Sequence, residues 1–201
     1  MDRLSNLLSF GHLHLLREML LDQVDVKDTL LDVGCGTGQF AIQCAQKNIK
    51  VTALDISSTM IEIASRAAKN KDVTDKIDFI CSDVSSAIIE RKFDVITFVY
   101  VIDVIPTYPE AVAVVNSAKV WLKPGGRIII ADETLQEKII LRHVVRLIRD
   151  PFFRFLSMKT NNKYHEIFDP PHILRDAGLT DIEQIKVSGG YFGLTIGYKK
   201  D

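Results

Sequence analysis

A short apolar segment runs directly into a turn of alternating glycines, and this transition constrains the fold more than any other feature of the sequence. Residues 30–40 read LLDVGCGTGQF. A glycine turn between a strand and a helix lets the backbone approach a ligand closely and leaves helix N–H groups free to bind it. The segment therefore predicts a strand, a turn and a helix that together form a cradle for a cofactor.

Strand-like and helix-like segments alternate along most of the chain. We expect strands at 29–33, 50–54, 76–81, 93–99 and 127–131, and helices at 4–21, 37–47, 59–69, 109–121, 137–149 and 173–177. This alternation favours a parallel sheet with right-handed crossovers. Near the end, 181–187 and 191–198 flank a Ser-Gly-Gly turn and predict an antiparallel hairpin. The expected fold is α/β, with a mostly parallel seven-stranded sheet, one antiparallel edge strand and helices on both faces.

Composition favours a single domain. The chain has 201 residues, 47% hydrophobic and 25% charged, and a formal net charge of −1 that predicts no general affinity for nucleic acid. The segment 93–106 is apolar but contains two aspartates and is too short to span a bilayer, and no secretory signal is evident. We expect a soluble, cytoplasmic protein.

The three cysteines, Cys35, Cys44 and Cys81, lack the spacing of metal ligands. We expect buried, reduced thiols and no metal site.

Glycine spacing and two carboxylates indicate which cofactor the cradle holds. Gly34, Gly36 and Gly38 give G-x-G-x-G, and Gln39 stands where a dinucleotide site has its third glycine. That departure counts against a nicotinamide-dependent oxidoreductase, although a tight turn without a ligand stays possible.

Asp55 follows the second strand and is placed either to accept hydrogen bonds from ribose hydroxyls or to cap a helix. Asp83 follows the third strand and suits an adenine amino group or a turn.

Taken together, these motifs resemble those of class I S-adenosylmethionine-dependent methyltransferases. The resemblance rests on residues 31–38, 54–60, 79–83, 93–96 and 122–126, in that order. It implies a Rossmann-like fold and S-adenosylmethionine as cofactor. Segments 2–11, 189–193 and 197–199 are similar to the ubiquinone/menaquinone-biosynthesis C-methyltransferases. Within one domain, the resemblance divides the chain into an N-terminal helical cover (1–27), a cofactor-binding core (28–132), a cap (133–172) and a terminal helix with hairpin (173–201).

The resemblance also implies roles for individual residues. The implied cofactor-binding residues are Asp32, Gly34, Cys35, Gly36, Gly38, Asp55, Ile56, Met60, Asp83, Val84 and Val99. The candidate substrate contacts are Phe10, Tyr100 and Tyr164, although an aromatic at Tyr100 could simply pack. A phenol or thiol acceptor also needs a proton removed, for which Asp103 and His165 are the candidates. Asp103 could equally cap a turn, and His165 could face solvent.

The expected activity is methylation of a small or isoprenoid-bearing molecule, with C-methylation of a quinone-type ring as the favoured reaction. O-, N- or thiol-methylation of a soluble metabolite is the main alternative, and a cofactor-binding protein without catalytic activity is a further one. Segment 138–159 alternates basic and apolar residues, which suits either a cap over the active site or contact with a membrane surface. We expect a monomer or homodimer.

Overall fold

The structure is a computed structural model that describes residues 12–133, 168–187 and 192–200. The strands are β1 (Thr29–Val33), β2 (Lys50–Asp55), β3 (Ile77–Cys81), β4 (Phe93–Val99), β5 (Leu122–Glu133), β6 (Thr180–Val187) and β7 (Phe192–Tyr198). The helices are α2 (His12–Leu21), α3 (Gln39–Gln46), α4 (Ser58–Asn70), α5 (Tyr108–Lys119) and α7 (Pro170–Asp176), with short 3₁₀ turns η1 (Thr74–Lys76) and η2 (Ile102–Val104). The predicted helix at 137–149 and the segment 138–159 lie outside the described residues.

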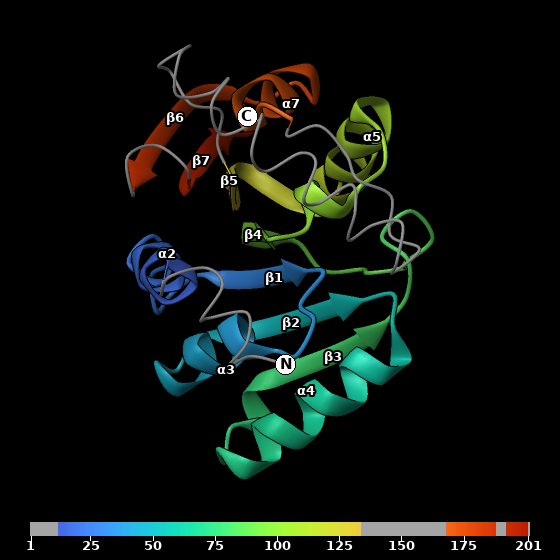
Figure 1. Cartoon of the computed structure of the whole chain (residues 1–201). Helices are drawn as coiled ribbons and strands as arrows, with labels where there is room; N and C mark the ends of the chain where they lie inside the picture. Colours follow the sequence, from blue (N-terminus) through green and yellow to red (C-terminus); the bar gives the residue numbers. More distant parts are fainter. Residues whose placement is uncertain (1–11, 134–167, 188–191, 201) are drawn as a thin grey trace, which may run out of the picture.

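All seven strands form one sheet in the order β3-β2-β1-β4-β5-β7-β6 (Figure 1). Strands β1 to β5 pair in parallel, and β7 pairs antiparallel with both β5 and β6. This confirms the predicted α/β fold. The reversed strand is β7, and it lies one position in from the edge because β6 folds back outside it.

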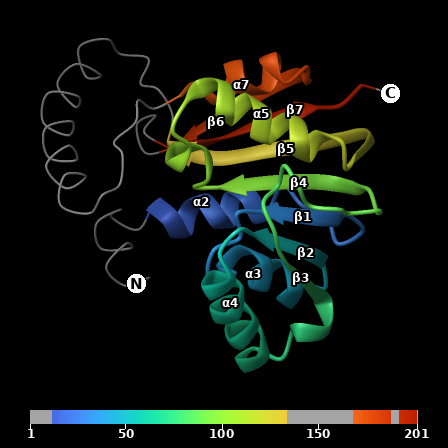
Figure 2. The same ribbon diagram turned by 90° about the vertical axis from the view of Figure 1, so that its right-hand side faces the viewer.

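Two apolar layers fix the helices on the two faces of the sheet (Figures 1 and 2). One cluster packs α2, α3 and α4 against residues such as Leu30, Val51 and Val95. The other packs α5 and α7 against the opposite face, through residues such as Ile96 and Ile128. Buried β1 and β4 therefore lie at the centre of the sheet, where both faces of a parallel strand are covered by helices.

The strand expected at 127–131 is longer in the structure, because β5 begins at Leu122 and contains an irregularity at 123–126. Phe93 pairs with Leu122, but Val95 pairs with Arg127, so the intervening residues of β5 are looped out. Backbone hydrogen bonds with Lys199 hold this bulge, from the Gly125 N–H at 3.1 Å and to the Gly126 carbonyl at 2.8 Å. Hydrogen bonding to the residue that follows β7 thus extends the pairing of β5 across the bulge.

The cysteine prediction was right for Cys44 and wrong for Cys81. All three thiols are free; Cys44 is buried, Cys35 is half-buried and Cys81 is exposed. Cys81 is the last residue of β3, an edge strand that has β2 on one side, and so it lies at a corner of the sheet. Among the described helices, none has the length and apolar character needed to cross a membrane.

Candidate functional site

The glycine loop, residues 34–38, leaves β1 at the edge of the sheet where the parallel strands end (Figure 1). Gly34, Gly36 and Gly38 all have positive φ, at 70°, 53° and 74°. The loop is tied to β2, because the Gly34 and Cys35 N–H groups both donate to the Leu54 carbonyl, at 2.7 and 3.0 Å. Only glycine adopts such a run of left-handed conformations without strain, which explains the spacing of the motif.

The three glycines face different surroundings. A Cβ on Gly34 would lie 2.5 Å from Val101 Cγ2, and one on Gly38 would lie 2.8 Å from Ala64 Cβ. A Cβ on Gly36 would meet nothing within 4 Å. Gly34 and Gly38 therefore permit close packing, whereas Gly36 opens the backbone to a ligand.

Asp55 connects the glycine loop to the start of α4. Its Oδ2 accepts a hydrogen bond from the Gly36 N–H at 2.8 Å, and its Oδ1 accepts one from the Ser57 N–H at 2.9 Å. The cap of α4 is Ser57, whose Oγ accepts from the Met60 N–H at 3.4 Å. A carboxylate can accept about four hydrogen bonds. Asp55 therefore keeps acceptor capacity for a pair of hydroxyl groups beside the open face of Gly36.

Apolar and acidic residues flank Asp55 along the same edge. Ile56 is 69% exposed, and Met60 is half-buried, so both offer apolar surface next to the loop. Asp83 is exposed, and its Oδ1 accepts hydrogen bonds from the Ser85 N–H at 2.7 Å and the Ser85 hydroxyl at 2.5 Å. These bonds lower the pKa of Asp83 below its ordinary value. Asp83 thus stabilises a turn by accepting both hydrogen bonds through Oδ1.

Val84 and Val99 lie beneath this surface on opposite sides of the sheet. Val84 packs against the cluster under α5 and α7, and Val99 packs against the cluster under α2 and α3.

Asp32 is a buried carboxyl in the centre of the sheet. It is 1% exposed and accepts a hydrogen bond from the hydroxyl of Thr97, its partner on β4, at 2.9 Å. Burial raises the pKa of Asp32 to about 7; the Thr97 hydrogen bond opposes this rise and the charge of Asp55 adds to it. Arg17 on α2 lowers the pKa of Asp32. The sequence analysis did not single out Arg17, although it is the one Arg or Lys between residues 12 and 21.

The thiols of the core are poor nucleophiles. Burial raises the pKa of both Cys35 and Cys44, and the nearby carboxylate of Asp32 raises both further. Cys35 therefore stays protonated inside the glycine loop and contributes packing to it.

The backbone changes direction sharply after β4. Tyr100 has φ of 56°, a left-handed conformation that is uncommon for a tyrosine, and its N–H donates to the Ala131 carbonyl at 3.0 Å. Its ring packs edge-on against Phe192, with centroids 6.2 Å apart. Tyr100 is thus placed by β5 and β7 as well as by β4.

Asp103 lies in η2, half-buried, one turn beyond Tyr100. Its N–H and that of Ile102 both donate to Asp132 Oδ2, at 3.2 and 3.0 Å. The sequence analysis missed Asp132, although a carboxylate directly after the strand expected at 127–131 was a usable signal. The predicted residues Phe10, Tyr164 and His165 lie outside the described residues.

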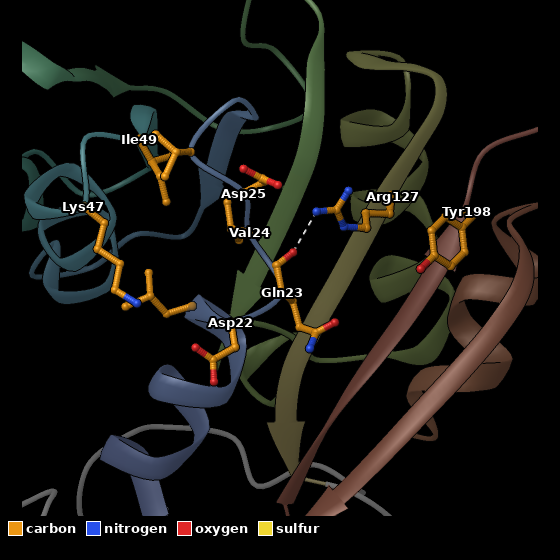
Figure 3. Close-up of a pocket in the computed structure, with 10 residues that line it drawn as sticks. Asp22, Gln23, Val24, Asp25, Lys47, Ile49, Arg127 and Tyr198 are labelled. Carbon is orange, nitrogen blue, oxygen red and sulfur yellow. Dashed lines mark hydrogen bonds between the residues drawn. The ribbon is translucent and has the colours of Figure 1, made fainter.

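A cavity of about 540 Å³ lies at the opposite edge of the sheet, where the parallel strands begin (Figure 3). Residues 21–26 line it together with Lys47, Ile49, Arg127 and Tyr198. The Arg127 guanidinium donates to the Gln23 carbonyl and to Asp28, each at 2.7 Å. These contacts join the segment after α2 to β5, and the lining includes none of the predicted site residues that the structure describes.

Comparison with known proteins agrees with the geometry of the glycine loop. Residues 30–126 match a family model described as a methyltransferase domain. A demethylmenaquinone methyltransferase from Staphylococcus haemolyticus is 27% identical over 99% of this chain and 89% of its own length. A ubiquinone biosynthesis O-methyltransferase from Actinobacillus pleuropneumoniae is 24% identical over 92% of this chain and 80% of its own length.

Solved structures share the fold. The S-adenosylmethionine-dependent methyltransferase SibL superposes with a TM-score of 0.73 at 20% identity, over 96% of this chain and 57% of that longer chain. Magnesium protoporphyrin IX methyltransferase from Synechocystis PCC 6803, solved with bound SAH, gives a TM-score of 0.66 at 19% identity, over 95% of this chain and 84% of that one.

Proposed function

We propose that this chain is a class I S-adenosylmethionine-dependent methyltransferase and that it methylates a small, isoprenoid-bearing aromatic acceptor of the quinone type. The observation that carries the cofactor part of this proposal is the pairing of Gly36 with Asp55. The open face of Gly36 lies beside a carboxylate with acceptor capacity left over.

The residues present fit the parts of S-adenosylmethionine. Asp55 would accept hydrogen bonds from the ribose hydroxyls, and the exposed side chain of Ile56 would lie against the adenine with Met60. Gly36 would approach the methionine portion through its open backbone face, and Asp32 beneath the loop would act on the ammonium through the buried end of β1. Asp83, adjacent to Val84, would meet the adenine amino group through the carboxylate oxygen that faces away from Ser85.

The bound cofactor supplies an electrophilic methyl carbon on a positively charged sulfur. The protein must hold the acceptor atom in line with that carbon and exclude water. Val99 and Tyr100 at the end of β4 would line this side of the site, and Tyr100 is held rigidly by its packing on Phe192. Asp103 in η2 would accept the proton that a phenol or ring carbon loses, a role it shares in this proposal with His165.

The choice of acceptor rests on the relatives. Two demethylmenaquinone methyltransferases, at 27% and 25% identity, align with 99% and 98% of this chain. Demethylmenaquinone is the acceptor that their name prints. A further relative, 24% identical over 98% of this chain, is named a ubiquinone/menaquinone biosynthesis C-methyltransferase, so methylation at carbon is the first candidate. Relatives named ubiquinone biosynthesis O-methyltransferases align with 92% and 90% of the chain, so methylation at oxygen is the second candidate.

An isoprenoid-bearing acceptor would reside in a membrane, and segment 138–159 carries six Lys and Arg among apolar residues. We propose that this segment binds an anionic membrane surface. Flotation with vesicles of phosphatidylglycerol and phosphatidylcholine tests this, and binding should weaken as salt rises. Absence of flotation at both low and moderate salt would overturn it.

Labelling tests the function directly. The protein is incubated with S-adenosylmethionine labelled in the methyl group and with separate lipid and aqueous extracts of cells. We expect label in a quinone-type lipid and much less of it with the Asp55→Ala variant at the same subsaturating cofactor concentration. Hydriodic acid distinguishes the two candidates, because it releases an O-methyl group as volatile methyl iodide and leaves a C-methyl group on the ring. Label confined to the aqueous extract would contradict the proposed acceptor.

A further inference from the structure

Asp132 is a buried carboxylate that organises a turn on a neighbouring strand connection. It is 1% exposed and lies near the end of β5. Its Oδ2 accepts the N–H groups of Ile102 and Asp103, at 3.0 and 3.2 Å. Both N–H groups belong to the start of η2, where a helical turn has no internal partner for them. Asp132 therefore supplies, from 29 or 30 residues away in sequence, the acceptor that this turn lacks.

The turn that Asp132 holds packs closely against the glycine loop. Val101 precedes η2, and a Cβ on Gly34 would lie only 2.5 Å from Val101 Cγ2. The same loop is fastened on its other side, since the Gly34 N–H donates to the Leu54 carbonyl at 2.7 Å. Gly34 is thus enclosed between β2 and the residue before η2.

The backbone between β4 and η2 leaves little room for η2 to shift on its own. The Tyr100 N–H donates to the Ala131 carbonyl at 3.0 Å, next to Asp132 in β5. Tyr100 also has a left-handed φ of 56°, a conformation that such tertiary contacts maintain. Two successive residues of β5 therefore set the path of residues 100–103.

From these contacts we propose that Asp132 is a positioning residue for the cofactor site. It acts through η2 and Val101 and keeps the glycine loop in the shape that binds S-adenosylmethionine. The proposal rests on the proposed function in one respect, namely that the glycine loop binds this cofactor. Asp132 itself need not touch the cofactor.

The test compares Asp132→Ala with Asp132→Asn, which keeps an oxygen that can accept the two N–H groups. Affinity is measured by calorimetry with S-adenosylhomocysteine, and the amides of Ile102 and Asp103 are followed by hydrogen exchange. We expect Asp132→Ala to speed exchange at both amides and to weaken binding by about tenfold, because two charge-assisted hydrogen bonds are lost. Asp132→Asn should stay within about threefold of the wild type, since a neutral acceptor is weaker but still present.

A matched control separates positioning from stability. Asp94 also accepts backbone and side-chain hydrogen bonds, from the Thr29 N–H at 2.8 Å and its hydroxyl at 2.6 Å, but at the edge where the strands begin. Asp94→Ala should lower the melting temperature without changing affinity. Val101→Ala tests the same path with Asp132 intact, and should weaken binding by about threefold through lost packing.

The outcomes are distinct. Unchanged affinity in both Asp132→Ala and Val101→Ala would overturn the proposal, as would an equal loss of affinity in Asp94→Ala. A wild-type chain that does not bind S-adenosylhomocysteine would instead overturn the proposed function. In that case hydrogen exchange at Ile102 and Asp103 still decides whether Asp132 holds the turn.

Discussion

Asp55 Oδ2 lies 2.8 Å from the backbone nitrogen of Gly36, so the carboxylate after β2 helps to shape the loop after β1. The two residues are 19 positions apart and come from separate motifs. The carboxylate therefore braces the glycine loop, and in the proposed function its remaining acceptor capacity binds the ribose hydroxyls. Loss of this side chain should therefore affect both loop stability and cofactor binding.

Replacing Asp55 by Ala should weaken S-adenosylhomocysteine binding by roughly 150-fold or more, because each of two hydrogen bonds to a charged acceptor contributes about 1.5–3 kcal/mol. Asp55→Asn should lose less, since its amide oxygen can still accept. Calorimetry measures the affinity, and thermal unfolding reports the smaller effect on the loop. Asp78→Ala is the control, because Asp78 lies exposed on neighbouring β3 and pairs with Arg91. An equal loss of affinity in the control would remove Asp55 from the ribose-binding role.

Alanine at Gly36 should mainly affect cofactor binding, whereas alanine at Gly38 should mainly affect stability. Both positions have positive φ, where an alanine costs about 1–2 kcal/mol of backbone strain. At Gly38 the new Cβ would also overlap Ala64, so Gly38→Ala should lower the melting temperature the more. At Gly36 the Cβ would enter the open side, so Gly36→Ala should chiefly abolish binding. If Gly36→Ala binds S-adenosylhomocysteine as the wild type does, the cofactor does not approach this face of the loop.

The sequence was enough to predict the central strands and the cradle, because these depend on local patterns. Continuous apolar residues marked β1 and β4 with their observed bounds, 29–33 and 93–99. The glycines required a turn there whatever the rest of the chain does.

Contacts between distant residues could not be predicted in the same way. Nothing local to Asp132 indicates that it accepts the amides of η2, because that contact depends on the pairing of β4 with β5. The exposure of Cys81 likewise depends on β3 being an edge strand, and the place of β7 depends on how β6 folds back. Arg17 affects Asp32 only because α2 packs on the same face of the sheet.

Asp32 should make the protein less stable as pH rises. Burial raises the pKa of Asp32 from 3.8 to about 7 in the folded state, so its protonated form favours folding. The protonated Asp32 makes its whole contribution to the free energy of unfolding below about pH 4, and this contribution is lost as pH rises through 7. Relative to Asp32→Asn, the free energy of unfolding should fall by up to about 1.4 kcal/mol per pH unit in this window.

Urea unfolding of the two proteins between about pH 4 and pH 8 measures the difference. Thr97→Val provides a second check, since loss of its hydrogen bond to Asp32 should raise the pKa of Asp32 further and extend the decline in stability to higher pH. Parallel stability curves for the wild type and Asp32→Asn would contradict the prediction.

Asp94 should produce the opposite dependence at acid pH. Burial tends to raise its pKa, but hydrogen bonds from Lys123 and Thr29 outweigh burial and lower the pKa of Asp94 to about 2. A carboxylate with a lowered pKa stabilises the fold above its unfolded value of 3.8 and loses that contribution as pH falls through 2. The wild type should therefore lose stability relative to Asp94→Asn between about pH 4 and pH 2, measured by urea unfolding.

A second variant, Lys123→Met, should shorten this pH window, because the ammonium 2.8 Å from Asp94 Oδ2 is one source of the lowered pKa. If the free energy of unfolding falls equally with pH in the wild type and in Asp94→Asn below pH 4, the Thr29 and Lys123 hydrogen bonds do not favour the charged form of Asp94.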